Sequence, residues 1–302
     1  MMNTKPLLGG VELGGTKCVC LIGTGPEDIR VELSVPTGTD PEATLSRIEE
    51  ILSSGISQHG PIHALGIASF GPVDLSRSSR TYGYITSTVK PGWQNTSVAT
   101  RLARALKVPV GFDTDVNGAA LAEGRWGAAK GLADYAYVTV GTGVGVGLVV
   151  NGGLAHGFGH PELGHIRIAR KAGDDWRGAC AYHHDCVEGL ASGVAIAARS
   201  GMAADLISCR DPVWEFVAHA IAQLLHALVL ATAPRRILVG GGVVQARPEL
   251  LLRIRQQLIQ SLNGYLELDA LIEPLDRYVV PPGLGASAGP LGALALALET
   301  AP

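Results

Sequence analysis

The chain has 302 residues, of which 47% are hydrophobic and 17% charged, and its formal net charge is −3. This length predicts roughly two domains, each able to bury a core. The composition excludes an intrinsically disordered chain. Because the net charge is slightly negative and no basic block occurs, nucleic acid and membrane surfaces are poor candidate partners.

Glycine is unusually frequent. It accounts for 40 of the 302 residues, about twice the share of about 7% in average proteins. The N-terminus lacks the apolar core of a signal peptide. The most apolar segment, 216–233, contains His219, Gln223 and His226, so a buried helix fits better than a membrane span. Five unevenly spaced cysteines are typical of a reduced cytoplasm with thiols free for metal. We therefore expect a cytoplasmic protein.

The first predicted element is a β-hairpin. Val11-Glu12-Leu13 ends in Gly14-Gly15-Thr16, and a strand pattern resumes at 17–22. Cys18 and Cys20 lie two residues apart, so they share one strand face, and we expect them in the core. Asp40-Pro41 then predicts a helix N-terminus, because Asp caps and Pro is tolerated in the first turn.

Strand and helix patterns alternate through the rest of the chain, which predicts an α/β class. Further strands are expected at 62–69, 108–112, 135–140, 237–239 and 278–280, and further helices at 97–106, 211–232 and 290–298. Each half also begins with an apolar strand, a glycine-rich turn with one threonine (Thr16 or Thr142) and a second apolar strand. A duplicated α/β unit with one phosphate-facing turn in each half explains this pattern.

Three glycine-rich turns follow strands, at 14–16, 141–147 and 240–242. Glycine lets backbone N–H groups approach an anion, because no Cβ intervenes. Each alone is more often an ordinary turn, but three together favour a polyphosphate ligand. The chain has no P-loop motif. The G-x-G-x-x-A match at 283–288 lies too near the end for a dinucleotide-binding unit, so we interpret it as a strand-to-helix turn.

A short segment combines thiols and imidazoles: Cys180-x-x-His183-His184-x-Cys186, preceded by His165. Two cysteines and two histidines at this spacing predict tetrahedral zinc on His165, Cys180, His183 and Cys186. The alternatives are a free-thiol turn, a redox pair, or a ligand set that uses His184 or His160. Four filled positions indicate a structural rather than a water-activating metal.

Four acidic residues surround these features. Asp113 and Asp115 follow a predicted strand, and Glu162 and Glu188 flank the proposed metal loop. Phosphoryl transfer needs a carboxylate that accepts the proton of the attacking hydroxyl. A single Asp at a strand end is more often a helix N-cap, but the glycine turns favour Asp115 as a base.

In order along the chain, these features resemble the ROK family of actin-like, hexokinase-type phosphotransferases. The residues that carry the resemblance are Gly10-x-Glu12-x-Gly14-Gly15-Thr16-Lys17, Gly66-Ile67-Ala68-Ser69-Phe70-Gly71-Pro72, Asp115-Val116-Asn117-Gly118-Ala119-Ala120, Gly141-Thr142-Gly143-x-Gly145, Glu162-Leu163-Gly164-His165 and Gly240-Gly241-Gly242. The resemblance covers nearly the whole chain. It implies a two-domain fold, with residues 1–118 and a C-terminal helix near 288–302 in one lobe and 119–287 in the other.

The resemblance also implies roles for individual residues. Asp115 is the expected general base, with ATP, Mg²⁺ and Zn²⁺ as cofactors. The sugar is expected to contact Gly71, Trp93, Thr114, Asn117, Glu162, His165 and Glu188. The nucleotide is expected to contact Gly14, Gly15, Thr16, Lys17, Gly141, Thr142, Gly143, Gly240, Gly241 and Gly242. For Trp93, stacking on the sugar and simple anchoring of a loop are equal alternatives.

Two departures from the family pattern bear on the substrate. Thr114 replaces a common Asn, and the zinc segment has Cys-x-x-His-x-x-Cys instead of three cysteines. Both resemble the bacterial fructokinase branch, so we expect D-fructose to be phosphorylated at its 6-position. The alternatives are a kinase of mannose, glucose or an N-acetylhexosamine, or a non-catalytic sugar-sensing protein. We expect no N-terminal DNA-binding motif and a homodimer.

Metal and sugar ligands are interleaved in this segment, because Glu162 precedes His165 by three residues and Glu188 follows Cys186 by two. We therefore expect the zinc to shape the sugar pocket. Since the phosphate turns come from other strands, metal loss is expected to spare the nucleotide side.

Overall fold

The computed structural model describes residues 5–266 and 275–301, and these form two compact units. Unit 1 comprises residues up to Lys130, the segment His156–His160 and residues from Ala286 onward, and unit 2 comprises Gly131–Ala155 and Pro161–Gly285. The boundary predicted after residue 118 falls inside a helix that belongs wholly to unit 1. The C-terminal helix belongs to unit 1.

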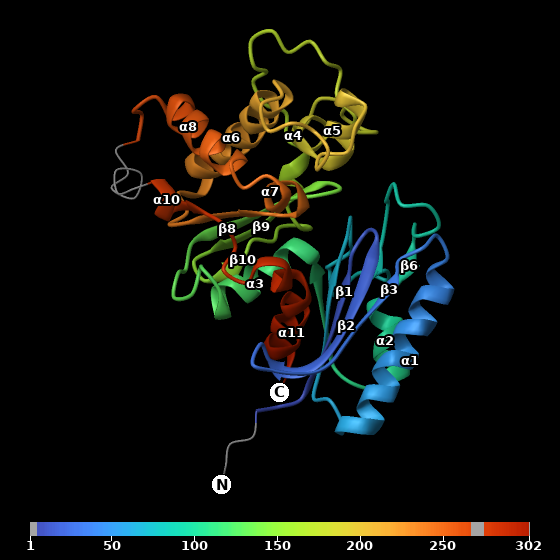
Figure 1. The fold of residues 1–302 in the computed structure, drawn as a ribbon. Helices are drawn as coiled ribbons and strands as arrows, with labels where there is room; N and C mark the ends of the chain where they lie inside the picture. Colours follow the sequence, from blue (N-terminus) through green and yellow to red (C-terminus); the bar gives the residue numbers. More distant parts are fainter. Residues whose placement is uncertain (1–4, 267–274, 302) are drawn as a thin grey trace. The chain divides into compact units, whose positions relative to one another are not determined.

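Unit 1 has a mixed five-stranded sheet in the order β3-β2-β1-β4-β7. Its elements are β1 (Leu8–Leu13), β2 (Lys17–Gly25), β3 (Asp28–Pro36), α1 (Pro41–His59), β4 (Leu65–Ser69), β5 (Tyr84–Ile85), β6 (Thr96–Ser97), α2 (Ala99–Leu106), β7 (Val110–Thr114), α3 (Asp115–Trp126) and α11 (Ala288–Thr300). Helix α11 packs against β1 and β4, and α1 packs against β2 and β3 on the opposite side of the sheet (Figure 1).

Alternation along β1 explains these two layers. Val11 and Leu13 are fully buried in the cluster that contains the apolar face of α1, together with Cys18 and Cys20. The prediction that these two thiols lie in the core is therefore confirmed. Gly10 faces the other way, where a Cβ would lie 3.2 Å from Ala293 of α11. The cap predicted for α1 is also present, since Asp40 Oδ1 accepts from the amides of Glu42 and Ala43.

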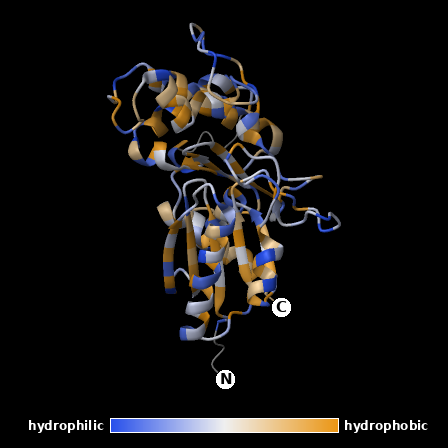
Figure 2. Cartoon of the chain, turned by 90° about the vertical axis from the view of Figure 1, so that its right-hand side faces the viewer, coloured by the Kyte–Doolittle hydropathy of each residue, from blue (hydrophilic) through white to orange (hydrophobic). Residues whose placement is uncertain are grey.

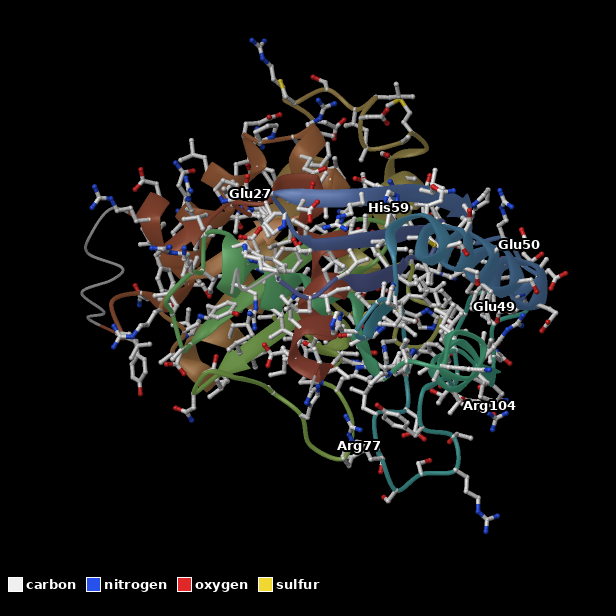
Figure 3. The ribbon with its side chains drawn as sticks, turned by 90° about the horizontal axis from the view of Figure 1, so that it is seen from below. Glu27, Glu49, Glu50, His59, Arg77 and Arg104 are labelled. Carbon is white, nitrogen blue, oxygen red and sulfur yellow. The ribbon has the colours of Figure 1, made fainter. Side chains whose placement is uncertain are left out.

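Helix α3 joins unit 1 because it crosses α11 closely. A Cβ on Gly292 would overlap the backbone of Gly118. This contact requires a glycine at position 292, and both helices belong to unit 1. Exposed charged side chains of the unit, including Glu27, Glu50, His59, Arg77 and Arg104, lie at its surface (Figure 3).

Unit 2 has a second five-stranded sheet, in the order β10-β9-β8-β11-β12. Its elements are β8 (Tyr135–Val140), β9 (Val144–Val150), β10 (Gly153–Leu154), the 3₁₀ turn η1 (Leu163–His165), α4 (Val187–Ala191), α5 (Gly193–Ser200), α6 (Val213–Thr232), β11 (Ile237–Gly240), α7 (Gly242–Ala246), α8 (Leu250–Leu262), α10 (Leu275–Tyr278) and β12 (Val279–Val280). The hydrophobic residues of both units concentrate along the strands and the inner helix faces (Figure 2).

Helix α6 is the apolar segment of the sequence analysis. Among the described residues it alone has the length and composition to cross a membrane, but 61% of its most apolar window is buried. Its buried side chains, such as Leu224 and Leu228, belong to the core of unit 2, and it packs against α8. Gln223 and His226 both hydrogen-bond to Ser261 of α8. The prediction of a buried helix is confirmed.

The two sheets have equivalent topology. β1 is antiparallel to β2 and parallel to β4, and β8 is antiparallel to β9 and parallel to β11. The turns at 14–16 and 141–143 therefore occupy matching positions, which confirms the predicted duplication. The second turn is shorter than expected, because β9 begins at Val144. A strand-to-helix turn at 285–287 precedes α11, also as predicted.

Candidate active site and metal cluster

Asp115 lies where the buried edge strand β7 passes directly into α3. Thr114 is the N-cap of α3, and its hydroxyl oxygen accepts from the Asn117 amide at 3.2 Å. Asp115 is the first helical residue, and its Oδ1 accepts from the Val116 amide at 2.9 Å. Burial raises the pKa of Asp115 to about 6, although the Val116 amide and its own amide oppose the shift. A carboxylate with this pKa is ionised at neutral pH yet basic enough to accept a proton.

Asp113, two residues earlier, is 4% exposed and has three donors. Its Oδ1 accepts from the Thr114 amide and from Asn117 Nδ2, both at 2.7 Å. Its Oδ2 lies 2.9 Å from His156 Nε2. Asn117, predicted to bind sugar, is 1% exposed and uses its side-chain amide on Asp113. No local sequence pattern indicates a role for His156, because 43 residues separate it from Asp113.

Glu12 is a second carboxylate of unit 1 with a raised pKa, and no role was predicted for it. Burial and the charge of Asp115 raise its pKa to about 7, and Lys17 opposes the shift. The side chain packs where α11 begins, since a Cβ on Gly289 would overlap its carboxylate. Its place inside the first glycine motif, Gly10-x-Glu12-x-Gly14-Gly15, was the available signal.

Two other predicted sugar contacts lie elsewhere in unit 1. Gly71 follows β4 and forms a cis peptide bond with Pro72. Trp93 is 0% exposed. Its ring packs edge-on against Phe70, and its N–H donates to the Gly38 carbonyl at 3.2 Å. Since no face of the ring is accessible, the structure contradicts sugar stacking by Trp93 and favours the alternative, a loop anchor.

The first glycine turn, Gly14–Lys17, joins β1 to β2, and its last three residues are exposed. The Gly14 amide donates to the Lys17 carbonyl at 3.1 Å, and the Thr37 hydroxyl donates to the Gly14 carbonyl at 2.6 Å. No heavy atom lies within 4 Å of a Cβ built on Gly15. The turn is therefore fixed on its inner side and open on its outer side.

The second glycine turn, Gly141–Gly143, is supported by the segment that carries the thiols. Glu188 Oε2 accepts from the Val144 amide at 3.1 Å, and a Cβ on Gly143 would lie 2.5 Å from the same oxygen. The Gly193 amide donates to the Gly141 carbonyl at 2.7 Å. Glu188 therefore connects this turn to the segment that carries the thiols, although the turn itself lies between β8 and β9. Thr142 at its centre is exposed.

The third glycine cluster ends β11 and begins α7. Gly241 has φ = +90°, and a Cβ there would lie 2.5 Å from the backbone of Val140. A Cβ on Gly240 would lie 2.5 Å from Pro282, whereas Gly242 has open space. Close backbone packing thus accounts for Gly240 and Gly241. At Gly242, which is exposed, no heavy atom lies within 4 Å of an added Cβ.

Four potential metal ligands converge in unit 2: His165, Cys180, His183 and Cys186. Their ligand atoms all lie within 4.8 Å of one another. The two Nδ1 atoms are 3.3 Å apart, and the three recorded sulfur-to-nitrogen distances are 3.6 to 3.7 Å. Zinc bonds of about 2.05 Å to nitrogen and 2.3 Å to sulfur at tetrahedral angles give separations of about 3.3 and 3.6 Å. The residues therefore fit a tetrahedral zinc ion.

Neighbouring groups orient this cluster. The amides of His183 and Gly189 point at the sulfurs of Cys180 and Cys186, at 3.5 and 3.4 Å. His165 directs Nδ1 into the cluster, and its Nε2 lies 3.9 Å from Glu188 Oε1. One imidazole thus contacts both the metal site and a predicted sugar ligand.

The other candidate ligands lie apart from the cluster. His160 belongs to unit 1, where its Nε2 accepts from the Val73 amide at 3.0 Å. His184 has φ = +58° and is exposed beside Arg167 and Arg177. The alternative ligand sets using His160 or His184 are therefore not supported. Glu162 is exposed, and its carbonyl accepts from the His165 amide at 3.0 Å as η1 begins.

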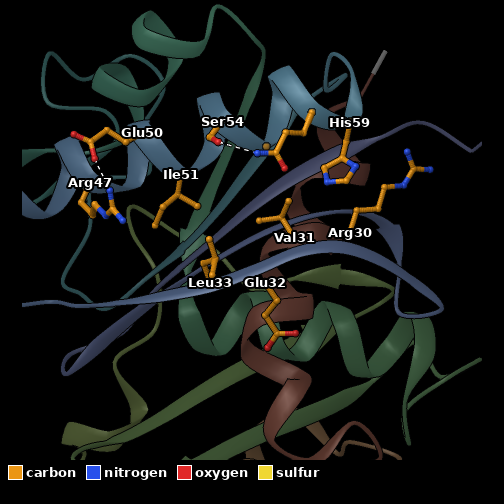
Figure 4. A pocket seen from close by; sticks show the side chains of 11 residues that line it. Arg30, Val31, Glu32, Leu33, Arg47, Glu50, Ile51, Ser54 and His59 are labelled. Carbon is orange, nitrogen blue, oxygen red and sulfur yellow. Dashed lines mark hydrogen bonds and ion pairs between the residues drawn. The ribbon is translucent and has the colours of Figure 1, made fainter.

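A groove between β3 and α1 contains none of the predicted site residues. Arg30, Val31, Leu33, Ile51 and His59 are among the residues that line it (Figure 4). Its rim carries an exposed ion pair between Arg47 and Glu50, at 2.7 Å.

Comparison with known proteins gives a family and a fold. The ROK family model matches residues 8–300. The chain is 43% identical to a fructokinase of Zymomonas mobilis, covering 99% of this chain and 98% of that protein. It is 40% identical to a fructokinase of Pediococcus pentosaceus, covering 96% of this chain and 97% of that protein.

A crystal structure of a ROK family glucokinase from Streptomyces griseus, in complex with glucose and AMPPNP, superposes with a TM-score of 0.75. The two chains are 25% identical, and the match covers 97% of this chain and 99% of the glucokinase. The predicted fold class, a two-domain α/β phosphotransferase fold, is thereby confirmed.

Proposed function

Because this chain belongs to the ROK family, we propose that it is a fructokinase that transfers the γ-phosphoryl group of ATP to the 6-hydroxyl of D-fructose. The observation that carries the choice of sugar is the 43% identity, over nearly the entire chain, to a fructokinase. The geometry that supports phosphoryl transfer is the β7–α3 turn with Asp115.

In the proposed reaction, Asp115 accepts the proton of the sugar hydroxyl as its oxygen attacks phosphorus. Its pKa of about 6 leaves it largely ionised at neutral pH. Thr114 and Val116 orient it through the N-terminal hydrogen bonds of α3. The amides of Gly14 and Gly141 are used within their own turns. The following amides, at 15–16 and 142–143, are suited to hold phosphate oxygens, since glycine keeps their surroundings free of side chains.

Mg²⁺ is bound through oxygen ligands and neutralises phosphate charge when present. Glu12 supplies the type of oxygen ligand that Mg²⁺ prefers. It is a half-buried carboxylate on the first glycine motif, and burial together with the charge of Asp115 raises its pKa to about 7. We assign Glu12 to this ion and Asp115 to the proton.

On the sugar side, Glu162, His165 and Glu188 are the proposed hydroxyl ligands of unit 2. We propose that a structural zinc ion binds His165, Cys180, His183 and Cys186. The recorded distances between the ligand atoms support this proposal, because they agree with tetrahedral coordination. The role proposed for the zinc ion is to hold the segment that carries His165 and Glu188 in one conformation. The homodimer and the cytoplasmic location remain part of this proposal.

The function is tested by an assay of ADP formation with ATP-Mg²⁺ and a panel of fructose, mannose, glucose and N-acetylmannosamine. We expect fructose to give the highest kcat/KM and the product to be the 6-phosphate by NMR. A higher value for glucose or mannose would replace the proposed substrate. Absence of turnover with every sugar, together with measurable sugar binding, would favour a sugar-sensing protein.

A further inference from the structure

The segment His156–His160 is distinctive in its connections. Of the described residues between 131 and 285, only these five group with unit 1. The segment is anchored at both ends, by His156 on Asp113 and by His160 on the Val73 amide. Between the anchors, Phe158 is fully exposed. The segment therefore docks through its two imidazoles, and one of them reaches the turn that carries Asp115.

The contact between His156 and Asp113 matters because Asp113 is a buried carboxylate. A buried carboxylate is costly unless donors satisfy both oxygens. The Thr114 amide and the Asn117 side chain serve Oδ1, and His156 serves Oδ2. The first two donors belong to the turn itself. The donor from His156 is the one recorded side-chain contact that ties Asp113 to a distant part of the sequence.

The bonds of Asp113 extend to Asp115 within one helical turn. Asp113 orients the Thr114 amide and the Asn117 side chain, and the Thr114 hydroxyl caps the Asn117 amide. Asp115 lies between these residues as the first residue of α3. Rotation of the Asp113 carboxylate would release both Thr114 and Asn117, and the N-terminus of α3 would lose its fixed geometry.

We propose that His156 is a positioning residue for phosphoryl transfer, which fixes Asp113 and thereby the turn that presents Asp115. The inference rests on the proposed kinase function. The Asp113 contact also raises the pKa of His156, as expected for an imidazole that donates to a buried carboxylate. His156 Nε2 also lies 3.4 Å from Asn117 Nδ2, so its two recorded contacts are with Asp113 and with the residue that Asp113 holds.

The test compares His156→Ala, which removes the donor, with His156→Gln, which retains an N–H donor. His59→Gln is the matched control, since His59 is an exposed histidine of unit 1 on the remote groove. For each variant, kcat, the KM values for fructose and ATP, and the melting temperature are measured. The free energy of a charge-assisted hydrogen bond corresponds to a factor of about 10 to 100 in an equilibrium or rate constant. We therefore expect His156→Ala to lower kcat by at least about tenfold.

Three features separate positioning from a merely structural role. The KM for ATP should stay within about twofold in His156→Ala, His156→Gln should recover kcat to within about threefold of wild type, and His59→Gln should match wild type. In the Asp113→Asn background, adding His156→Ala should cost little more, because contacting residues are not additive. A folded His156→Ala enzyme with the wild-type kcat, or a Gln variant as impaired as the Ala variant, would overturn the proposal.

A wild-type protein that phosphorylates none of the sugars would refute the proposed function instead. Hydrogen exchange then decides the role of His156 separately. The Thr114 and Asn117 amides should exchange at least about tenfold faster in His156→Ala than in His59→Gln. Equal exchange rates at these two amides would show that His156 does not hold the turn.

Discussion

The two glycine turns occupy equivalent places in two sheets of the same topology, yet different groups support them. In unit 1 a neutral hydroxyl, Thr37, holds the Gly14 carbonyl. In unit 2 a carboxylate, Glu188, holds the Val144 amide, and it lies two residues beyond a thiol of the metal cluster. The comparison teaches that a duplicated backbone can acquire distinct supports, a hydroxyl in one half and a carboxylate beside a cluster of thiols and imidazoles in the other.

The largest effect on activity should come from substitution of Asp115, which has no counterpart in unit 2. Asp115→Asn should lower kcat by about 10²–10⁴-fold, the usual contribution of a general base, without reducing bound zinc. Asp175→Asn, which changes an exposed aspartate of unit 2, is the control. An Asp115→Asn enzyme that keeps more than about a tenth of the wild-type rate, with the control unaffected, would remove Asp115 from its proposed role.

The same variant should be more stable at neutral pH. Because the pKa of Asp115 is raised by burial, the folded state binds its proton more tightly than the unfolded state, and this group lowers stability as pH rises through the range up to about 6. Removal of the charge should raise the free energy of unfolding at pH 7.5 by on the order of 1–3 kcal/mol. Urea unfolding should show little of this difference at pH 4.

Metal loss should be the next largest effect and should reach both substrates. Cys180→Ser should reduce zinc from about one per chain, lower the melting temperature, and weaken fructose affinity by about tenfold, as for other groups that orient metal sites. Because Glu188 also supports the second glycine turn, we expect weaker nucleotide binding as well. Elemental analysis measures the zinc content, and separate titrations with fructose and with an ATP analogue measure the two affinities.

Cys209→Ser is the matched control, since Cys209 is an exposed thiol of the same unit and lies outside the cluster. It should leave metal content and both affinities unchanged. Nucleotide affinity that stays constant after zinc loss would show that the contact between Glu188 and Val144 does not transmit the change.

A pair of alanine substitutions compares the two turns directly. In Gly143→Ala the Cβ would lie 2.5 Å from Glu188 Oε2, so overpacking should cost about 1–3 kcal/mol. Gly15→Ala has open space and should keep the wild-type melting temperature, while its methyl group obstructs phosphate and raises the KM for ATP. If both variants melt alike, the two turns are supported in the same way.

The smallest effect should come from the hydroxyl that supports the first turn. Thr37→Val removes the donor to the Gly14 carbonyl and should lower the free energy of unfolding by about 1 kcal/mol. Thr37→Ser keeps the hydroxyl and should recover most of that loss. The contrast with Gly143→Ala measures how much more strongly the second turn is supported.

Local patterns predicted the elements that contain these groups. Period-two apolar runs and glycine turns identified β1, β2 and β8, and Asp40-Pro41 identified the start of α1. The start of strand β9 was misplaced because Gly145 and Gly147 interrupt its valines, so residues 144–147 were interpreted as part of the turn. Strand β3 was missed because it is an edge strand with mostly exposed side chains.

Within the site, residues close in sequence were predictable and distant pairs were not. The spacing of Cys180, His183 and Cys186 predicted a cluster that the structure assembles with His165. No local pattern indicates that His156 meets Asp113 or that Glu188 meets Val144, because these contacts depend on how elements pack. For Trp93 the sequence suggested a sugar contact that the structure does not support. Its position beside a motif suggested stacking on the sugar, but the ring is buried and anchors a loop.

The pH dependence of kcat/KM for fructose, measured from pH 4.5 to 9 with saturating ATP-Mg²⁺, tests most directly the claim that Asp115 is the base. On the free enzyme this quantity reports the ionisation of the essential base. With a pKa of about 6 for Asp115, the rate should be level above neutrality and fall about tenfold per unit below pH 6. A rate that stays constant down to pH 5 in a folded enzyme would contradict the account.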